Sequence, residues 1–155
     1  MPGGRRCTRL HGSALVQFVP SQVAMSHPAS VLVIDDDEVV TATFGQMLQQ
    51  EGFDVRMATD PARGLNEAAR ARPDAILLDL RMPVIDGLMF LRCLREQETG
   101  SPTPVAIVTG DYLLDEETID VAQELGATIA FKPLWLEDLV AIARQLVDVR
   151  AAVQA

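Results

Sequence analysis

From Ser30 onward, five short apolar runs alternate with segments whose apolar residues recur at helical spacing. The runs are Val31–Ile34, Val55–Ala58, Ala75–Leu78, Val105–Val108 and Thr128–Phe131. Apolar runs of this length, separated by helices, are typical of parallel strands that are buried on both faces of a sheet. Because crossovers between parallel strands are right-handed, five βα units predict an α/β fold, a doubly wound three-layer sandwich around a five-stranded parallel sheet.

The segments between the runs carry the start and stop signals of helices. Asp60-Pro61 is typical of an N-cap followed by proline at the first helical position, and Gly52 and Gly126 are typical of helix ends. The expected helices are one containing Val40–Leu48, one from Pro61 to before Pro73, Gly87–Gln97, Asp115–Leu125 and Trp135–Arg150. The second helix is expected to bury Ala62, Leu65, Ala68 and Ala69.

Charge divides the chain of 155 residues into two parts. Residues 1–29 contain three arginines and no acid, whereas the rest of the chain holds all 22 acids. This step predicts a disordered or weakly ordered extension at 1–29, a folded domain at 30–150 and a tail at 151–155. Translation starting at Met25 is an alternative explanation of the extension. Because so little chain follows Arg150, we expect a stand-alone domain without an attached output domain.

Composition argues against several classes of partner. A net charge of −9 does not suit nucleic-acid binding, which requires a basic face. The uncharged stretch from Leu10 to Ile34 contains two prolines and four serines, so it is too polar to cross a membrane. Cys7 and Cys93 form no C-x-x-C pair, and we expect them to be free thiols in the cytoplasm.

Polar residues follow four of the five apolar runs directly. Asp35-Asp36-Asp37-Glu38 follows the first run, Asp79 the third, Thr109 the fourth, and Lys132, the only lysine of the chain, the fifth. In open parallel sheets, ligands bind at the carboxyl ends of the strands. These residues are therefore predicted to form one site.

The residue types indicate the chemistry of that site. Several carboxylates at one point repel each other unless a cation joins them, and oxygen ligands suit Mg²⁺. A hydroxyl and an ammonium group nearby can stabilise phosphoryl oxygens, and a carboxylate between them can accept a phosphoryl group. The set predicts phosphoryl transfer onto an aspartate. Asp37 has a plainer role as a helix N-cap.

Four sequence motifs resemble the receiver domain of two-component response regulators. They are residues 31–38 (VLVIDDDE), 78–87 (LDLRMPVIDG), Val108-Thr109-Gly110 and Lys132-Pro133. The resemblance extends from about Ser30 to Arg150. It implies a CheY-like, flavodoxin-like fold and a protein that takes part in its own phosphotransfer and dephosphorylation, without being a turnover enzyme.

The resemblance also implies partners and roles for the acids. Asp79 would accept a phosphoryl group from a sensor histidine kinase or a histidine phosphotransfer protein. Asp36, Asp79 and the backbone carbonyl of Arg81 would bind Mg²⁺, with Asp35 acting mostly through water. Phosphorylation would then promote binding to an unknown downstream protein, or dimerisation. A phosphorelay intermediate or phosphate sink is the alternative role.

Four further residues receive roles from the same resemblance. Lys132 would pair with Asp79 and then with the phosphoryl oxygens, and Thr109 would hydrogen-bond the phosphoryl group. Pro83 and Gly87 would shape the loop after the third strand.

The sequence departs from the family at one switch position. Receivers usually carry an aromatic residue three positions before the lysine, where this chain has Ile129. Tyr112, in the loop after Thr109, is a candidate substitute. An ion pair between Arg81 and Asp111 is a second hypothesis, because it would screen the attacking water and prolong the phosphorylated state.

An enzyme is the distant alternative. The motif from Asp35 to Val39, together with Thr109 and Lys132, also resembles haloacid dehalogenase phosphatases. In that case Asp35 would be the nucleophile and Asp37 the acid and base. No clear acidic motif follows Lys132, however, and Asp79 would have no role.

Overall fold

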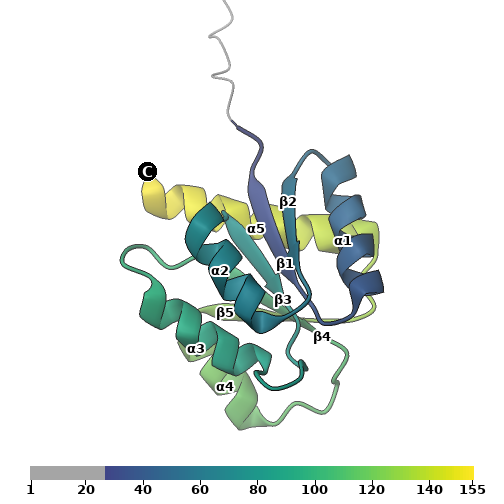
Figure 1. Cartoon of the computed structure of the whole chain (residues 1–155), viewed down its shortest axis with the longest axis vertical. Coiled ribbons are helices and arrows are strands. Elements are labelled where there is room, and N and C mark those ends of the chain that lie inside the picture. The colour runs from purple at the N-terminus through teal and green to yellow at the C-terminus, as the bar shows by residue number, and fades with distance from the viewer. Residues whose placement is uncertain (1–26) are drawn as a thin grey trace, which may run out of the picture.

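A computed structural model of the chain describes residues 27–155, in which strands and helices alternate (Figure 1). The strands are β1 (Ser30–Ile34), β2 (Asp54–Ala58), β3 (Ala75–Leu78), β4 (Val105–Thr109) and β5 (Ala127–Phe131). The helices are α1 (Glu38–Gln50), α2 (Pro61–Ala71), α3 (Gly87–Gln97), α4 (Glu116–Glu124) and α5 (Leu136–Gln154). The five strands pair in parallel in the order β2-β1-β3-β4-β5, which confirms the doubly wound α/β fold.

Two hydrophobic layers cover the sheet, one on each face. Alternate residues of a strand point to opposite faces. Leu32 and Ile34 therefore pack with α2, α3 and α4, whereas Val31 and Val33 pack with α1 and α5. Figure 1 shows α2 and α3 in front of the sheet and α5 behind it. The central strands β1, β3 and β4 are almost completely buried, while the edge strands β2 and β5 are partly exposed.

Most element boundaries lie within a residue of the expected ones. Pairing between strands extends four of the apolar runs by one residue, to Ser30, Asp54, Thr109 and Ala127. Four helices begin after an aspartate whose side chain accepts a hydrogen bond from a backbone N–H, which satisfies part of the helix start. These aspartates are Asp37, Asp60, Asp86 and Asp115.

Two expectations about helices are wrong. The last helix does not end at Arg150 with a tail at 151–155, because α5 continues to Gln154. Ala151 and Ala152 favour helix, and no glycine or proline follows Arg150 to stop it. In α2, Ala62 and Ala69 are exposed rather than buried, and Gly64 is buried instead.

The expectations about the N-terminal extension concern mostly residues outside the part of the chain that the structure describes. The expected extension at 1–29 and the alternative start at Met25 lie outside residues 27–155, apart from residues 27–29, which form no helix or strand. No helix between residues 27 and 155 is long and apolar enough to span a membrane.

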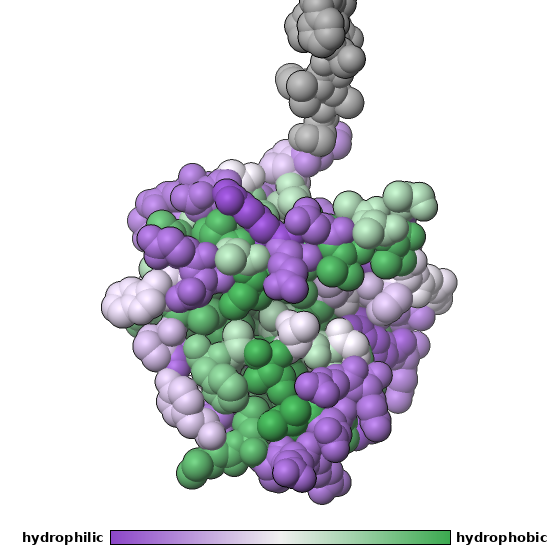
Figure 2. Space-filling model, turned by 180° about the vertical axis from the view of Figure 1, so that it is seen from behind, coloured by the Kyte–Doolittle hydropathy of each residue, from purple (hydrophilic) through white to green (hydrophobic). Residues whose placement is uncertain are grey.

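Some large hydrophobic side chains remain at the surface. Figure 2 shows hydrophobic atoms together on the side turned away in Figure 1, with hydrophilic atoms around them. Leu113, Phe131 and Trp135 are among the exposed hydrophobic residues. Since they lie at or just after the carboxyl ends of β4 and β5, apolar surface adjoins the edge where the candidate residues gather.

Candidate functional site

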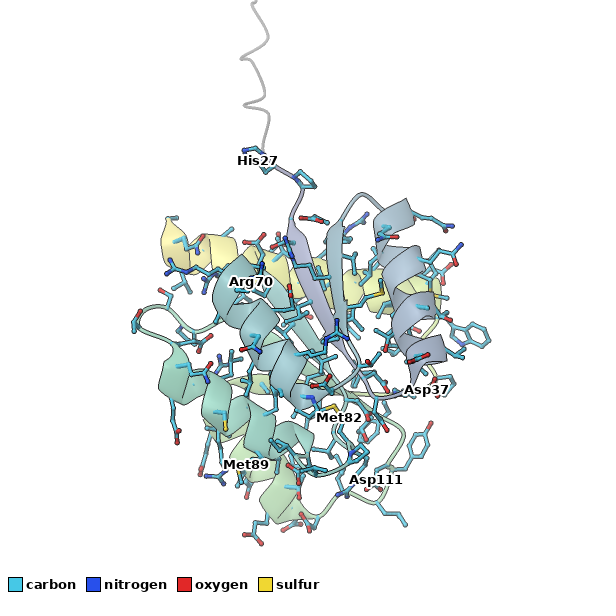
Figure 3. The ribbon with its side chains drawn as sticks, viewed as in Figure 1. His27, Asp37, Arg70, Met82, Met89 and Asp111 are labelled. Carbon is cyan, nitrogen blue, oxygen red and sulfur yellow. The ribbon has the colours of Figure 1, made fainter. Side chains whose placement is uncertain are left out.

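Backbone hydrogen bonds hold the candidate residues at the carboxyl edge of the sheet. The N–H of Asp79 donates to the carbonyl of Ile34 at 2.8 Å, and the N–H of Lys132 donates to the carbonyl of Thr109 at 2.8 Å. These bonds continue the strand pairing past the strand ends. Figure 3 shows Asp37 and Asp111 near this end of the molecule and His27 at the other.

Three carboxylates come together at this edge. One oxygen atom each from Asp35, Asp36 and Asp79 lies within 4.8 Å of the others. Asp35 and Asp79 are buried, with 4% and 7% of their surface exposed, whereas Asp36 is exposed. A set of three carboxylate oxygens, open on one side, fits a hard cation such as Mg²⁺. Asp37 lies outside this group and caps α1, as its plainer interpretation predicts.

Lys132 bridges the two buried acids. Its Nζ atom lies 2.6 Å from Oδ2 of Asp35 and 3.3 Å from Oδ1 of Asp79. The resemblance implied a pairing with Asp79, and the shorter contact is with Asp35. The ammonium group contacts two of the three carboxylates, and its single positive charge leaves negative charge for a cation to balance.

Burial and charge shift the acid–base properties of this group. Burial raises the pKa of Asp79, the neighbouring charge of Asp35 raises it further, and Lys132 offsets part of the rise. Burial lowers the pKa of Lys132, but the hydrogen bond to Asp35 and the charges of both acids outweigh it, so that this pKa stands above its ordinary value. The two shifts have a common origin, since Lys132 and the buried acids lie close enough to change each other's pKa.

Thr109 is completely buried at the end of β4. Its Oγ1 atom accepts a hydrogen bond from the backbone N–H of Asp111 at 3.1 Å, which fixes the start of the next loop. Its binding of a phosphoryl group remains a prediction.

The loop between β3 and α3 requires a glycine at its end. A Cβ atom on Gly87 would lie 2.6 Å from the carbonyl oxygen of Asp79, closer than real contacts allow. The N–H of Gly87 also donates to the carbonyl of Leu80 at 2.8 Å. Pro83 is exposed, and its carbonyl accepts a hydrogen bond from the N–H of Ile85 at 2.8 Å. The role of the Arg81 carbonyl as a metal ligand remains a prediction.

Arg81 and Asp111 form the ion pair that the sequence suggested. The Nε atom of Arg81 donates to Oδ2 of Asp111 at 3.0 Å, and an Nη atom contacts the same oxygen. The pair connects the loops that follow β3 and β4, next to Asp79 and Thr109.

Tyr112 connects the β4–α4 loop to the end of β5. Its ring stacks on Phe131 at 5.6 Å between ring centroids, and its hydroxyl donates to the backbone carbonyl of Lys132. Ile129 packs partly buried against the core. Sequence reasoning singled out Tyr112 but missed Phe131, whose place in an apolar run predicted only a strand residue.

Two observations weigh against the phosphatase alternative. Asp37, the acid and base of that hypothesis, uses its side chain to accept hydrogen bonds from the N–H groups of Val39 and Val40. Asp79, which would have no role in that hypothesis, lies in the buried site at 3.3 Å from Lys132 Nζ.

Comparisons with known proteins point to one family. The model of the response regulator receiver domain matches residues 31–144. The chain is 37% identical over 123 residues to the transcriptional regulatory protein PrrA of Mycobacterium leprae, covering 79% of this chain and 51% of that protein. It is 40% identical over 132 residues to a protein-glutamate methylesterase/protein-glutamine glutaminase of Anaeromyxobacter dehalogenans, covering 81% of this chain and 36% of that protein. The chain thus spans about half or less of the length of these two relatives.

Solved structures also resemble this chain, over nearly the whole of their own length. The chemotaxis protein CheY4 of Vibrio cholerae superposes with a TM-score of 0.70 at 30% identity, covering 77% of this chain and 98% of that chain. A CheY-like receiver domain from Methanospirillum hungatei superposes with a TM-score of 0.74, covering 81% and 98%, and at 23% identity it supports the fold alone. The chain belongs to the response regulator receiver domain family of two-component signalling.

Proposed function

We propose that Asp79 is the phosphoacceptor of this receiver and that it takes its phosphoryl group from a phosphohistidine. The donor would be a sensor histidine kinase or a histidine phosphotransfer protein. The observation that carries the proposal is the position of Asp79, which is buried between two further acids and the only lysine of the chain. A carboxylate so placed can act as a nucleophile beside groups that stabilise phosphoryl oxygens.

The residues divide the work of transfer among them. Asp36 and Asp79, with Asp35 and the carbonyl of Arg81, would hold Mg²⁺. When bound, the ion neutralises the carboxylates and stabilises phosphoryl oxygens. An Oδ atom of Asp79 forms a bond to phosphorus as the bond from phosphorus to the histidine nitrogen breaks, and histidine leaves with that electron pair. Lys132 Nζ then turns from the carboxylates to the phosphoryl oxygens, and Thr109 Oγ1 donates to them.

Room for a donor exists beside Asp36. A cleft of about 310 Å³ opens there, with Pro61, Pro83 and Ile85 among its lining residues. Apolar walls beside an acidic site suit the approach of an imidazole ring, which is partly apolar.

The Arg81–Asp111 pair supports a second part of the proposal, that the phosphorylated state is long-lived. A salt bridge at the loops beside Asp79 would hinder the water that hydrolyses the acyl phosphate. Slower loss of phosphate from Arg81→Ala than from the wild type would contradict this.

The output step is proposed to be protein binding rather than DNA binding, in the cytoplasm. The exposed apolar surface beside β5 supports a downstream protein or a second copy of the chain as the partner. Tyr112 is proposed to transmit the change, since it touches both the end of β5 and the Lys132 carbonyl. Unchanged phosphorylation-dependent binding in Tyr112→Ala would contradict that role.

Phosphotransfer profiling tests the function. The full chain is mixed with candidate histidine kinases that carry a labelled phosphoryl group, with Asp79→Ala as the control. We expect label on the wild type and none on the variant. Phosphate-dependent capture of a protein then supports an output role, while rapid return of label to a histidine carrier supports a relay.

A further inference from the structure

A buried hydroxyl holds the acidic loop between β1 and α1. Thr41, in α1, is 2% exposed. Its Oγ1 atom lies 2.9 Å from the carbonyl oxygen of Asp35 and 2.8 Å from the carbonyl oxygen of Asp37. These two carbonyls belong to the residues on either side of Asp36. One hydroxyl therefore contacts the backbone both before and after this acid.

The contact with Asp35 is not an ordinary helical one. The Asp37 carbonyl already accepts the backbone N–H of Thr41 at 3.0 Å, as a helix requires. Asp35 lies beyond the last residue of β1 and six residues before Thr41 in the chain. The hydroxyl therefore ties the end of the strand to the start of the helix across the acidic loop.

The acids flanking Asp36 are fixed through their side chains as well. Oδ1 of Asp35 accepts the N–H of Asp37 at 2.9 Å, and Oδ2 accepts Lys132 Nζ at 2.6 Å. Asp36 is exposed, and no hydrogen bond or ion pair of its carboxylate is found within residues 27–155. No side-chain partner within the described part of the chain fixes the Asp36 carboxylate. Its position therefore depends on the loop backbone, which Thr41 contacts on both sides of Asp36.

We propose that Thr41 is a positioning residue that sets the three-acid group of Asp35, Asp36 and Asp79 in its cation-binding arrangement before the cation binds. This rests on the proposed function, in which these acids hold Mg²⁺. Ligands that are already ordered bind more tightly, because binding then carries less entropic cost. Thr41 is not a ligand itself, and its effect on the ion passes through the backbone of the loop.

Replacement of the hydroxyl by a methyl group tests the proposal. Thr41→Val keeps the volume and the branched Cβ but cannot donate. We expect the dissociation constant for Mg²⁺, measured by titration calorimetry on the full chain, to rise about tenfold, as for other groups that orient metal ligands. Thr41→Ser keeps the hydroxyl and should bind Mg²⁺ close to the wild-type affinity.

Thr43 provides a matched control two residues along the same helix. Its hydroxyl donates to the carbonyl of Val39 at 2.6 Å, four residues back, and it is exposed and does not touch the acidic loop. Thr43→Val should leave Mg²⁺ affinity unchanged. All affinities are measured well below the melting temperature of each ion-free variant, so that unfolding does not imitate weak binding. If Thr41→Val does not fold, Thr41→Ala is compared with Thr41→Ser.

The outcomes separate this inference from the proposed function. If the wild type binds Mg²⁺ and Thr41→Val binds it equally well, the positioning role is wrong and the metal site stands. If the serine variant is as weak as the valine variant, the hydroxyl is not the cause and the inference is wrong. If the wild type itself binds no Mg²⁺, the proposed metal site fails, and the inference fails with it.

Discussion

Asp79 is an energetically costly residue in this fold. It lies buried beside Asp35, and Lys132 offsets only part of the resulting rise in its pKa. A carboxyl group whose pKa is higher in the folded chain than in the unfolded chain favours folding less as the pH rises. The free energy of unfolding falls as the pH rises from the ordinary pKa of 3.8 to the raised pKa in the folded chain.

Asp79→Asn should therefore stabilise the ion-free protein at neutral pH. Each pKa unit between the folded and unfolded values corresponds to about 1.4 kcal/mol in the free energy of unfolding. Denaturant unfolding without Mg²⁺ should show the variant above the wild type at pH 7. The gap should close as the pH falls below 3.8, where the carboxyl is protonated in both states. A gap that does not change with pH would contradict this explanation.

Val84 carries backbone strain next to the site. Its φ is 69°, in the left-handed region that branched side chains rarely adopt, and its side chain is fully exposed. Val84→Asn should raise the free energy of unfolding by about 1 kcal/mol, because asparagine tolerates this conformation and no packing is lost. Chemical denaturation measures the gain, and Val84→Ile, which keeps the branched Cβ, should show none. An equal gain in both variants would exclude strain as the cause.

Among the elements, α3 carries one arginine whose side chain forms hydrogen bonds to two neighbouring segments. Arg95 donates through Nε to the carbonyl of Leu125 at 2.8 Å, and through Nη1 to the carbonyl of Thr103 at 2.9 Å and to Glu98 at 2.8 Å. These bonds hold together the ends of α3 and α4 and the loop before β4. Their partly buried setting makes them costly to lose.

Arg95→Met should lower the free energy of unfolding by about 2 kcal/mol, since it leaves two partly buried carbonyls and one oxygen of the Glu98 carboxylate without a partner. Arg70→Met is the control, because Arg70 is 81% exposed and lies 3.9 Å from its acid, and exposed pairs contribute little. Thermal unfolding of both variants gives the comparison. Equal effects would mean that the contacts of Arg95 add nothing beyond those of a surface pair.

The elements and the centre of the site could be predicted because they follow from local pattern. Apolar runs indicate where the strands lie. Residues that directly follow parallel strands must meet at one edge of the sheet, so the pattern predicts that Asp35, Asp79 and Lys132 lie together. The burial of Gly64 in α2 could not be predicted. A Cβ atom there would lie 2.9 Å from Ile34 Cδ1, a contact that depends on how the helix is set on the sheet.

Other contacts depend on side chains meeting across the fold. Thr41 has the pattern of an ordinary helix residue, and nothing in the sequence places its hydroxyl on the Asp35 carbonyl. The stack of Tyr112 on Phe131 joins residues from two segments, and its existence depends on the path of the β4–α4 loop. Such pairings arise from packing, which periodicity does not encode.

At the scale of the whole molecule, the fold gathers its chemistry at one edge. The core packs on both faces of the three central strands. The ends of β1, β3 and β5 bring acids and a lysine into one group. The exposed apolar residues at the ends of β4 and β5 adjoin the same edge. A change of charge at Asp79 is thus well placed to alter the surface that a partner would touch.

The central claim is that Asp79 carries the phosphoryl group. An acyl phosphate on aspartate is reduced by borohydride to homoserine, which marks the modified position for peptide sequencing by mass spectrometry. After phosphotransfer in the presence of Mg²⁺ and reduction, we expect homoserine at position 79 alone, and none when the donor is omitted. Homoserine at position 35, 36 or 37, with position 79 unchanged, would contradict the account.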